Sequence, residues 1–181
     1  MNDKTEKPEQ LSVECAYSLL RGMRALNKPT LTTKAVIFND LYLYVMGSDR
    51  VDRSAVEQVL EGNEKLKSVY EKMLYGERLF YTQRLVAAES NEHIDQRSGE
   101  GFVLKIRESK ADSNQYYLIL EVDPLLYRKA KRTVVLHACT DKVTSSCVFP
   151  ALYDGKTQLI VSKGDKLLTL LRESDPEISI V

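Results

Sequence analysis

The sequence predicts an α+β protein: an N-terminal four-helix domain followed by a small antiparallel β-sandwich or barrel domain. Two observations predict this class. Up to about Glu89, apolar residues recur at spacings of three and four, which is the period of an amphipathic helix. From Phe102 onward they alternate with polar residues or form short runs, as in strands. We therefore expect a helical domain at residues 10–89, a linker at 90–101 and a β-rich domain at 102–181.

The first half is expected to hold helices at 10–27, at about 33–46, at 52–60 and at 64–89. The second of these helices is apolar nearly all round. This predicts that it is buried on more than one side or covered by a partner. The Gly-Asn pair at 62–63 is typical of a helix end and separates the third helix from the fourth.

The second half shows strand patterns separated by polar turns, and Asp154-Gly155 is a strong tight-turn dipeptide. The polar, glycine-containing stretch at 90–101 favours a linker before the first strand. A short helix is expected at 167–173. The expected strands are FVLKIRE (102–108), QYYLILEVD (115–123), RTVVLHAC (132–139), SSCVFP (145–150), TQLIVS (157–162) and ISIV (178–181).

Charge and cysteine content narrow the class of protein. Lys and Arg together number 26, as do Asp and Glu, so the formal net charge is zero. Nucleic-acid binders usually carry a basic excess that displaces counterions, so direct nucleic-acid binding is not expected. No signal peptide is visible, and no apolar run approaches the roughly 20 residues that span a bilayer. Cys15, Cys139 and Cys147 lack CxxC spacing, which indicates reduced thiols in a cytoplasmic protein without a membrane partner.

No common catalytic or nucleotide-binding motif occurs in the sequence, and we expect neither a metal nor another cofactor. His137 and Cys139 lie two residues apart on one expected strand and therefore share a face. One interpretation is the start of a thiolate–imidazole pair or of a metal site. The other is a histidine beside a core cysteine, which the strong burial preference of cysteine favours. Two ligands also fall short of the four that zinc takes.

Other polar features have a structural and a functional interpretation. The basic run YRKAKR at 127–132 is either a solvated loop or a contact for a phosphate or an acidic partner. Asp40, Asp49 and Asp52 lie near helix ends, where they are expected to cap backbone amides. The helical half is rich in tyrosines, which serve either as core residues with a wet hydroxyl or as partner anchors: Tyr42, Tyr44, Tyr70, Tyr75 and Tyr81.

The stretch Phe38–Leu74 resembles the anti-sigma domain of bacterial anti-sigma factors. LYLYVMGSDRV (41–51) is similar to the helix and glycine turn that open that domain, and SAVEQVL (54–60) is similar to its short helix. GNEKLKSVYEKML (62–74) is similar to the start of its long helix. The zinc-binding branch of the family carries a His-x3-Cys-x2-Cys motif. Its positions correspond here to Val59, Asn63 and Leu66, so the resemblance implies a member without the metal site.

The resemblance implies a non-enzymatic, soluble regulatory protein that sequesters an alternative sigma factor. The second helix and the long helix would insert between the domains of that factor, and the β-rich part would sense or dock. The partner-binding residues are then expected at Phe38, Leu41, Tyr42, Tyr44, Val45, Tyr70, Met73 and Leu74. The alternatives are an adaptor or structural subunit of a larger bacterial complex, an enzyme that uses His137 and Cys139, and a nucleic-acid module built on 127–132.

Overall fold

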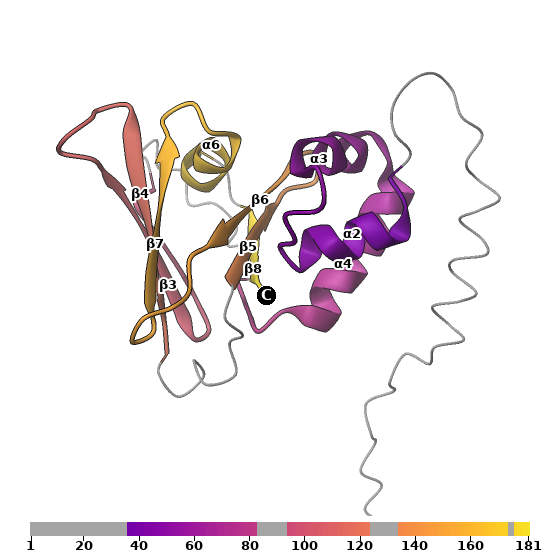
Figure 1. Ribbon diagram of the computed structural model, residues 1–181, viewed down its shortest axis with the longest axis horizontal. Helices are drawn as coiled ribbons and strands as arrows, with labels where there is room; N and C mark the ends of the chain where they lie inside the picture. The colour runs from indigo at the N-terminus through magenta and orange to yellow at the C-terminus, as the bar shows by residue number, and fades with distance from the viewer. Residues whose placement is uncertain (1–35, 83–93, 124–133, 174–175) are drawn as a thin grey trace, which may run out of the picture. The chain divides into compact units, whose positions relative to one another are not determined.

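The computed structural model describes residues 36–82, 94–123, 134–173 and 176–181. The helix expected at 10–27 and the basic run at 127–132 lie outside these ranges. Residue contacts group Asn39–Val181 into one compact unit, separate from the preceding segment, of which the structure describes residues 36–38. Figure 1 shows the elements of the compact unit stacked as a helical layer, a first sheet and a second sheet.

The helical layer contains α2 (Phe38–Val45), α3 (Arg53–Gly62) and α4 (Glu64–Glu77). Two side chains fix where α3 and α4 begin. Asp52 Oδ1 accepts a hydrogen bond from the Ala55 amide, and Asn63 Oδ1 accepts one from the Leu66 amide, each at 3.1 Å. Each cap satisfies an amide that has no partner within its helix. The expected third helix and the capping role of Asp52 are therefore confirmed.

Two antiparallel four-stranded sheets follow. Sheet A has the order β1-β8-β5-β6 and sheet B the order β2-β3-β4-β7. The strands of sheet A are β1 (Phe80–Tyr81), β8 (Glu177–Ile180), β5 (Val134–Cys139) and β6 (Thr144–Phe149). Those of sheet B are β2 (Gln96–Gly99), β3 (Phe102–Glu108), β4 (Gln115–Val122) and β7 (Lys156–Ser162).

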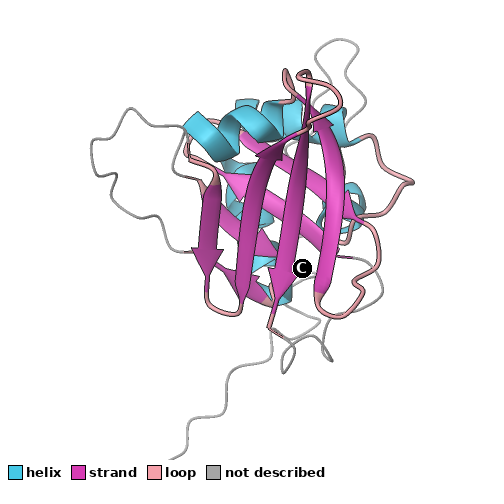
Figure 2. Cartoon of the chain, turned by 90° about the vertical axis from the view of Figure 1, so that its left-hand side faces the viewer, coloured by secondary structure: helices cyan, strands magenta, loops and turns pink. Residues whose placement is uncertain are grey.

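The main core lies between the two sheets, and the C-terminal helix α6 (Lys166–Glu173) contributes to it. Leu104 and Leu118 point into it from sheet B, Leu136 from sheet A and Leu171 from α6, and all four side chains are fully buried. In Figure 2 sheet B faces the viewer and the helices lie behind it. The helix expected at 167–173 and the strands expected from 102 onward are confirmed, with end points that move by one or two residues.

Sheet A is covered on both faces. All six residues of β5 are buried, because alternate side chains enter the main core and the others meet the helical layer. Gly47, which follows α2, shows how close that layer comes. A β-carbon at Gly47 would lie 2.4 Å from Val135 Cγ2 of β5, and the φ of +72° also favours glycine. The helices therefore rest directly on the outer face of sheet A.

The expected fold class, a four-helix N-terminal domain followed by a separate β domain, is wrong. The described helices α2 to α4 belong to the same compact unit as both sheets, and no helical domain is formed by the described residues. The physical reason is that these helices pack on sheet A as well as on one another. His137 of β5 bonds to the end of α2, and Val135 of β5 lies against Gly47. The β part is two stacked sheets with helices on one outer face.

Two local expectations also need correction. The fourth helix ends at Glu77 rather than continuing to Glu89, because Arg78 turns to extended backbone and Phe80 and Tyr81 pair with β8 as strand β1. Apolar residues at these positions fit a strand as well as a helix, and burial of Phe80 in the main core favours the strand. Within the expected linker, residues 96–99 form the polar edge strand β2.

No helix among the described residues is long and apolar enough to cross a membrane.

Candidate functional site

A buried polar network joins the helical layer to sheet A, and it contains both residues of the expected His137–Cys139 pair. His137, on β5, is fully buried between Tyr70 of α4 and the end of α2. Its Nδ1 lies 2.9 Å from the Tyr70 hydroxyl, and its Nε2 lies 3.0 Å from the carbonyl oxygen of Val45. Cys139 Sγ lies 3.6 Å from the same Tyr70 hydroxyl. The prediction that His137 and Cys139 share a face is confirmed.

These contacts fix where the protons lie. A carbonyl oxygen only accepts hydrogen bonds, so His137 Nε2 carries the proton that is donated to Val45. In a neutral imidazole Nδ1 then accepts, and it does so from the Tyr70 hydroxyl. That hydroxyl in turn accepts from the Cys139 thiol. Burial lowers the pKa of His137 to about 3, so the ring is neutral at ordinary pH.

Burial also keeps the two described thiols protonated, Cys139 beside Tyr70 and Cys147 on the side of the main core. Burial raises the pKa of Cys139 to about 11 and that of Cys147 to about 12. Burial also raises the pKa of the Tyr70 hydroxyl well above its ordinary value, with further contributions from Cys139 and Tyr44. A reactive cysteine needs a lowered pKa and access to a substrate. The group around His137 instead holds α2 and α4 against β5.

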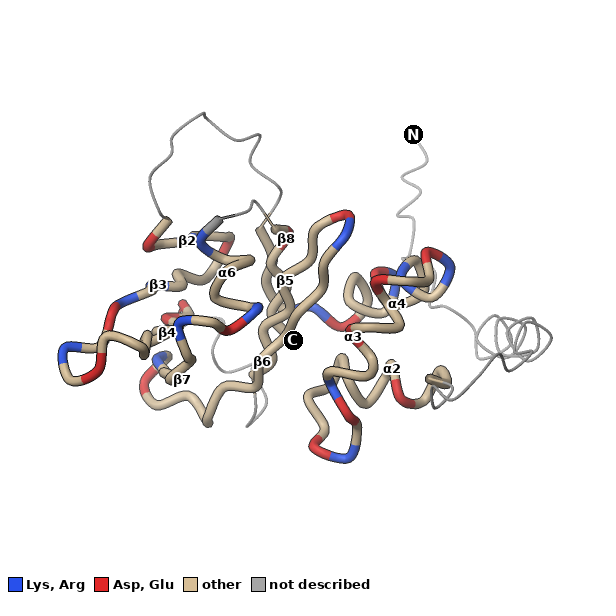
Figure 3. Tube along the Cα trace, turned by 90° about the horizontal axis from the view of Figure 1, so that it is seen from above, with Lys and Arg blue, Asp and Glu red and all other residues tan. Residues whose placement is uncertain are grey.

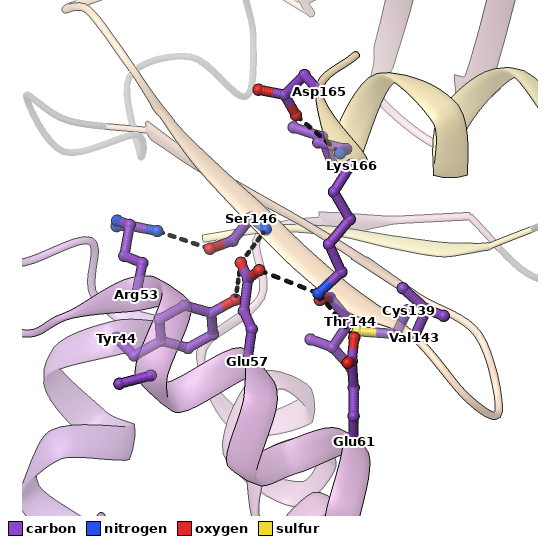
Figure 4. Close-up of polar contacts among 12 residues, drawn as sticks. Tyr44, Arg53, Glu57, Glu61, Cys139, Val143, Thr144, Ser146, Asp165 and Lys166 are labelled. Atoms are coloured by element: carbon purple, nitrogen blue, oxygen red, sulfur yellow. Dashed lines mark hydrogen bonds and ion pairs between the residues drawn. The ribbon is translucent and has the colours of Figure 1, made fainter. Parts of the chain in front are cut away.

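A second part of the network is centred on Glu57 of α3, which is 9% exposed (Figure 4). Its Oε1 accepts hydrogen bonds from the Tyr44 hydroxyl at 2.9 Å and from the Ser146 amide at 3.1 Å. Its Oε2 accepts one from Lys166 Nζ at 3.2 Å. Burial and the charge of Glu57 raise the pKa of Tyr44, so its hydroxyl remains a donor. A buried carboxylate is stable when charged and polar donors surround it in this way.

These bonds cap the free edge of sheet A. The Val143 carbonyl points toward β5, where it accepts from the Thr140 amide at 2.8 Å. Because successive residues of a strand bond in opposite directions, Thr144 and Ser146 point away from β5. Lys166 donates to the Thr144 carbonyl at 2.8 Å, and Glu57 accepts from the Ser146 amide. Side chains of α3 and α6 thus occupy hydrogen-bonding groups that another strand would otherwise pair with.

Lys166 connects the two helices across this edge. Its Nζ lies 3.2 Å from Glu57 Oε2 and 2.7 Å from Glu61 Oε1. Partial burial lowers the pKa of Lys166, but the hydrogen bond to Glu61 and the charge of Glu57 outweigh it, and the pKa is raised. The ammonium group is therefore charged at neutral pH, and the cap is an ion pair.

The residues expected to bind a partner do not form one exposed surface. Five of them are buried: Leu41, Tyr44, Val45, Tyr70 and Leu74. Phe38 and Met73 are half-buried, and Tyr42 is 42% exposed. The structure brings Tyr44, Val45 and Tyr70 together around His137. The apolar character of α2 is therefore explained by cover from the chain's own sheet.

The outer face of sheet B is not covered by any described element (Figure 2). Tyr117 and Ile119 of β4 project from it, and Ile160 of β7 lies directly opposite Tyr117. Ile160 is 53% exposed. These three neighbouring side chains form an apolar patch, called the sheet B patch below. A contiguous apolar patch on a protein surface marks an interaction site more often than a single exposed apolar residue does.

Charged residues border the sheet B patch. Lys105 lies opposite Ile119, and its Nζ is 2.8 Å from Glu121 Oε1 on β4. Lys156 approaches the same carboxylate at 3.7 Å. The hydrogen bond from Lys105 holds the pKa of Glu121 below its ordinary value. Figure 3 shows acidic and basic residues interspersed along the described chain, without a broad region of one sign.

Sequence reasoning missed most of these residues. Glu57 follows Val56 and precedes Leu60 on the buried side of α3, and a carboxylate there was an available signal of a buried polar contact. In QYYLILEV, apolar residues occur at both alternating sets of positions. This pattern was a signal that Tyr117 and Ile119 would lie on the outer face. No local signal points to Lys166, whose partners lie on α3 and β6.

The described residues contain no cluster of three His, Cys, Asp or Glu side chains that could hold a metal ion. Comparisons with models of protein families, with curated proteins and with solved structures found no match to this chain.

Proposed function

We propose that the protein is a non-enzymatic binding module that engages another protein through the sheet B patch. The observation that carries this proposal is the contrast between the two sheets. The outer face of sheet A is buried under helices, whereas that of sheet B presents Tyr117, Ile119 and Ile160 without cover from a described element. Aromatic and aliphatic side chains surrounded by polar residues are the usual anchors of protein interfaces.

The charges around the patch support a protein partner rather than a nucleic acid. Lys105 and Lys156 are both within ion-pair distance of Glu121, so part of the basic character is neutralised within the face. A nucleic-acid platform instead needs basic groups that are free to replace counterions, together with several aromatic rings for stacking. On the outer face of the described strands of sheet B, the only aromatic side chain is that of Tyr117.

The chemistry of the buried network supports a binding role over an enzymatic one. His137 is neutral and fully buried, and the pKa of the Cys139 thiol is raised. Both are engaged with Tyr70. A nucleophile needs an ionised, accessible thiolate, and these two residues meet neither requirement.

A sigma factor is the first specific partner to test, because the sequence resemblance suggests it. Insertion of the helices into that partner would require α2 and α4 to leave sheet A and break the contacts of His137. Binding through the sheet B patch needs no such rearrangement. An adaptor role in a larger complex is the second candidate, and it uses the same patch.

Affinity capture with matched baits tests the proposal. The baits are the wild-type chain, the double variant Tyr117→Ala, Ile119→Lys, and the variant Tyr42→Ala, which alters the exposed tyrosine of α2 instead. We expect one stoichiometric partner, identified by mass spectrometry, to be retained by wild type and Tyr42→Ala and lost from the double variant. Circular dichroism would check that the double variant is folded.

The opposite pattern, in which Tyr42→Ala loses the partner and the folded double variant keeps it, would place binding on the helices and overturn the proposal. Recovery of nucleic acid instead of a protein, with binding that weakens steeply as salt rises, would also overturn it.

A further inference from the structure

The two sheets have four edges, and they differ in how they are protected. Strand β1 is two residues long, and β2 is four residues long and polar. The edge of β6 is capped by Glu57 and Lys166. Strand β7 is seven residues long and lies at the other edge of sheet B. At its ends Lys156 is bonded to Tyr153 and the Ser162 carbonyl to the Asp165 amide, but among the described residues nothing caps the outward groups of Gln158 and Ile160 in its middle.

Hydrogen bonds at both ends of β7 show which backbone groups face outward. The Gly155 carbonyl accepts from the Val122 amide at 2.7 Å, and the Lys163 amide donates to the Asn114 carbonyl at 2.8 Å. Both bonds point toward β4. Lys156 bonds instead to Tyr153 through its amide and its carbonyl, on the opposite side. By alternation, the amides and carbonyls of 158, 160 and 162 face away from β4.

The composition of this edge does not discourage pairing. Natural edge strands are usually blocked by a proline, a bulge or a charge near the middle. In β7 the central residues TQLIV contain neither proline nor charge, and the lysines at 156 and 163 lie at or beyond its ends. Ile160, near the middle, exposes 53% of its surface. The edge therefore offers both backbone groups and apolar surface to a second strand.

We propose that β7 pairs with β7 of a second copy of this chain, antiparallel about a two-fold axis at Ile160, to form one continuous eight-stranded sheet. In this register Ile160 lies opposite Ile160 of the second copy, and Gln158 lies opposite Ser162 of the second copy. The two copies of Ile160 exchange both of their hydrogen bonds, and the Ser162 amide donates to the Gln158 carbonyl of the second copy. The Ser162 carbonyl already accepts from the Asp165 amide at 2.9 Å and takes the Gln158 amide on its second lone pair. The inference does not rest on the proposed partner of the sheet B patch.

Charge and geometry select this register. Lys156 lies opposite Gly164 of the second copy and Lys163 lies opposite Thr157, so no like charges face each other. A register centred on Leu159 would place Ser162 of the second copy against Lys156, whose backbone groups are already bonded to Tyr153. In the register centred on Ile160, Lys156 lies just beyond the last paired residue, so its bonds to Tyr153 stay intact.

Sedimentation equilibrium of the full chain over a range of concentrations tests the proposal, and we expect the mass to rise from monomer to dimer. Gln158→Pro removes an outward amide without removing a bond to β4. It should weaken the dimer by roughly tenfold or more, because the two-fold axis doubles the loss. Gln158→Val keeps the amide and is the matched control, with dimerisation close to that of wild type.

A second variant keeps the test decisive if Gln158→Pro does not fold. Ile160→Lys retains every backbone group and places two ammonium groups opposite each other, so it should also weaken the dimer. Tyr117→Ala changes the sheet B patch away from the edge and should leave dimerisation intact even where it abolishes capture of a partner. A chain that stays monomeric at all concentrations, or a dimer that both edge variants leave unchanged, overturns the proposal.

Discussion

His137 shows how a single side chain can look catalytic in sequence and be structural in the fold. It stands two residues from a cysteine, but its two ring nitrogens are used by Tyr70 and by the Val45 carbonyl. The ring therefore bridges α4 and the end of α2 through β5. The Val45 carbonyl requires a proton on Nε2, and burial keeps the ring neutral, so Nδ1 accepts from the Tyr70 hydroxyl. The neutral ring therefore supports the hydrogen bonds that hold α2 and α4 against sheet A.

This arrangement predicts a pH dependence of stability. The pKa of His137 is about 3 in the folded chain, against about 6.5 when unfolded. Below about pH 6.5 the unfolded state takes up a proton that the folded state does not bind. Stability is therefore unaffected by this group above that pH and falls as the pH decreases, by about 1.4 kcal/mol per unit at most. Denaturant unfolding at pH 7, 6 and 5 would measure the decrease.

The matched variant is His137→Gln, whose amide can still donate to Val45 but does not titrate. It should be less stable than wild type at pH 7, because the Tyr70 hydroxyl loses its acceptor. Between pH 7 and pH 5 its stability should change less with pH than that of wild type. An equal pH dependence in the two proteins would show that His137 is not the titrating group.

The edge strands β6 and β7 differ in how their outward backbone groups are bonded. Outward backbone groups of β6 are bonded by Glu57 and Lys166, which come from two different helices. Among the described residues, the outward groups of β7 are bonded only at its ends, at Lys156 and at the Ser162 carbonyl, and those of Gln158 and Ile160 have no cap. An uncapped strand edge is a template for pairing, whereas a charged cap excludes another strand. This difference is why we place self-association on sheet B.

The cap predicts unequal effects for two glutamates on the same helix. Glu57→Ala leaves the Tyr44 hydroxyl and the Ser146 amide without their acceptor, so it should destabilise the fold by about 3–5 kcal/mol. Glu61→Ala removes only a partly exposed contact to Lys166 and should cost less than about 1 kcal/mol. Denaturant unfolding of both variants measures the difference. Similar losses of stability would contradict the assigned cap.

For the molecule as a whole, the helical layer and both sheets form one compact unit from Asn39 to Val181. Sheet A separates the helices from the main core and is buried on both faces at β5. Removing the helices would expose alternate side chains of β5, including His137. We therefore expect the helices and the sheets to unfold together.

Gly47→Ala tests this coupling. The added β-carbon would meet Val135 of β5 at 2.4 Å, and the φ of +72° is strained for alanine, so a loss of roughly 1–3 kcal/mol is expected. Hydrogen exchange should show protection lost to the same extent in α4 and in β4. Gly62→Ala is the control, since nothing lies within 4 Å of its β-carbon position. Loss of protection in α4 alone would indicate separate unfolding units.

Much of the local structure could be predicted because its cause is local. Alternation along 102–108 and 115–122 follows from one buried and one outer face, and Asp154-Gly155 forms the expected turn, with φ of +49° and +74°. Asp52 and Asn63 begin the helices that their side chains cap. Prediction failed at Phe80 and Tyr81, because apolar residues there suit a helix as well as a strand. It also failed at β2, whose polar residues become a strand only by pairing with β3.

By itself, the sequence determined the helices α3 and α6, the strands from 102 onward, that α2 must be covered, and that His137 and Cys139 share a face. Only the tertiary structure decided what covers α2, because an apolar stripe specifies burial but not the surface that buries it. The same holds for the candidate site. Glu57, Ser146 and Lys166 are far apart in the chain and meet because α3 and α6 flank β6. The sheet B patch exists because no described element covers β4 and β7 on that side.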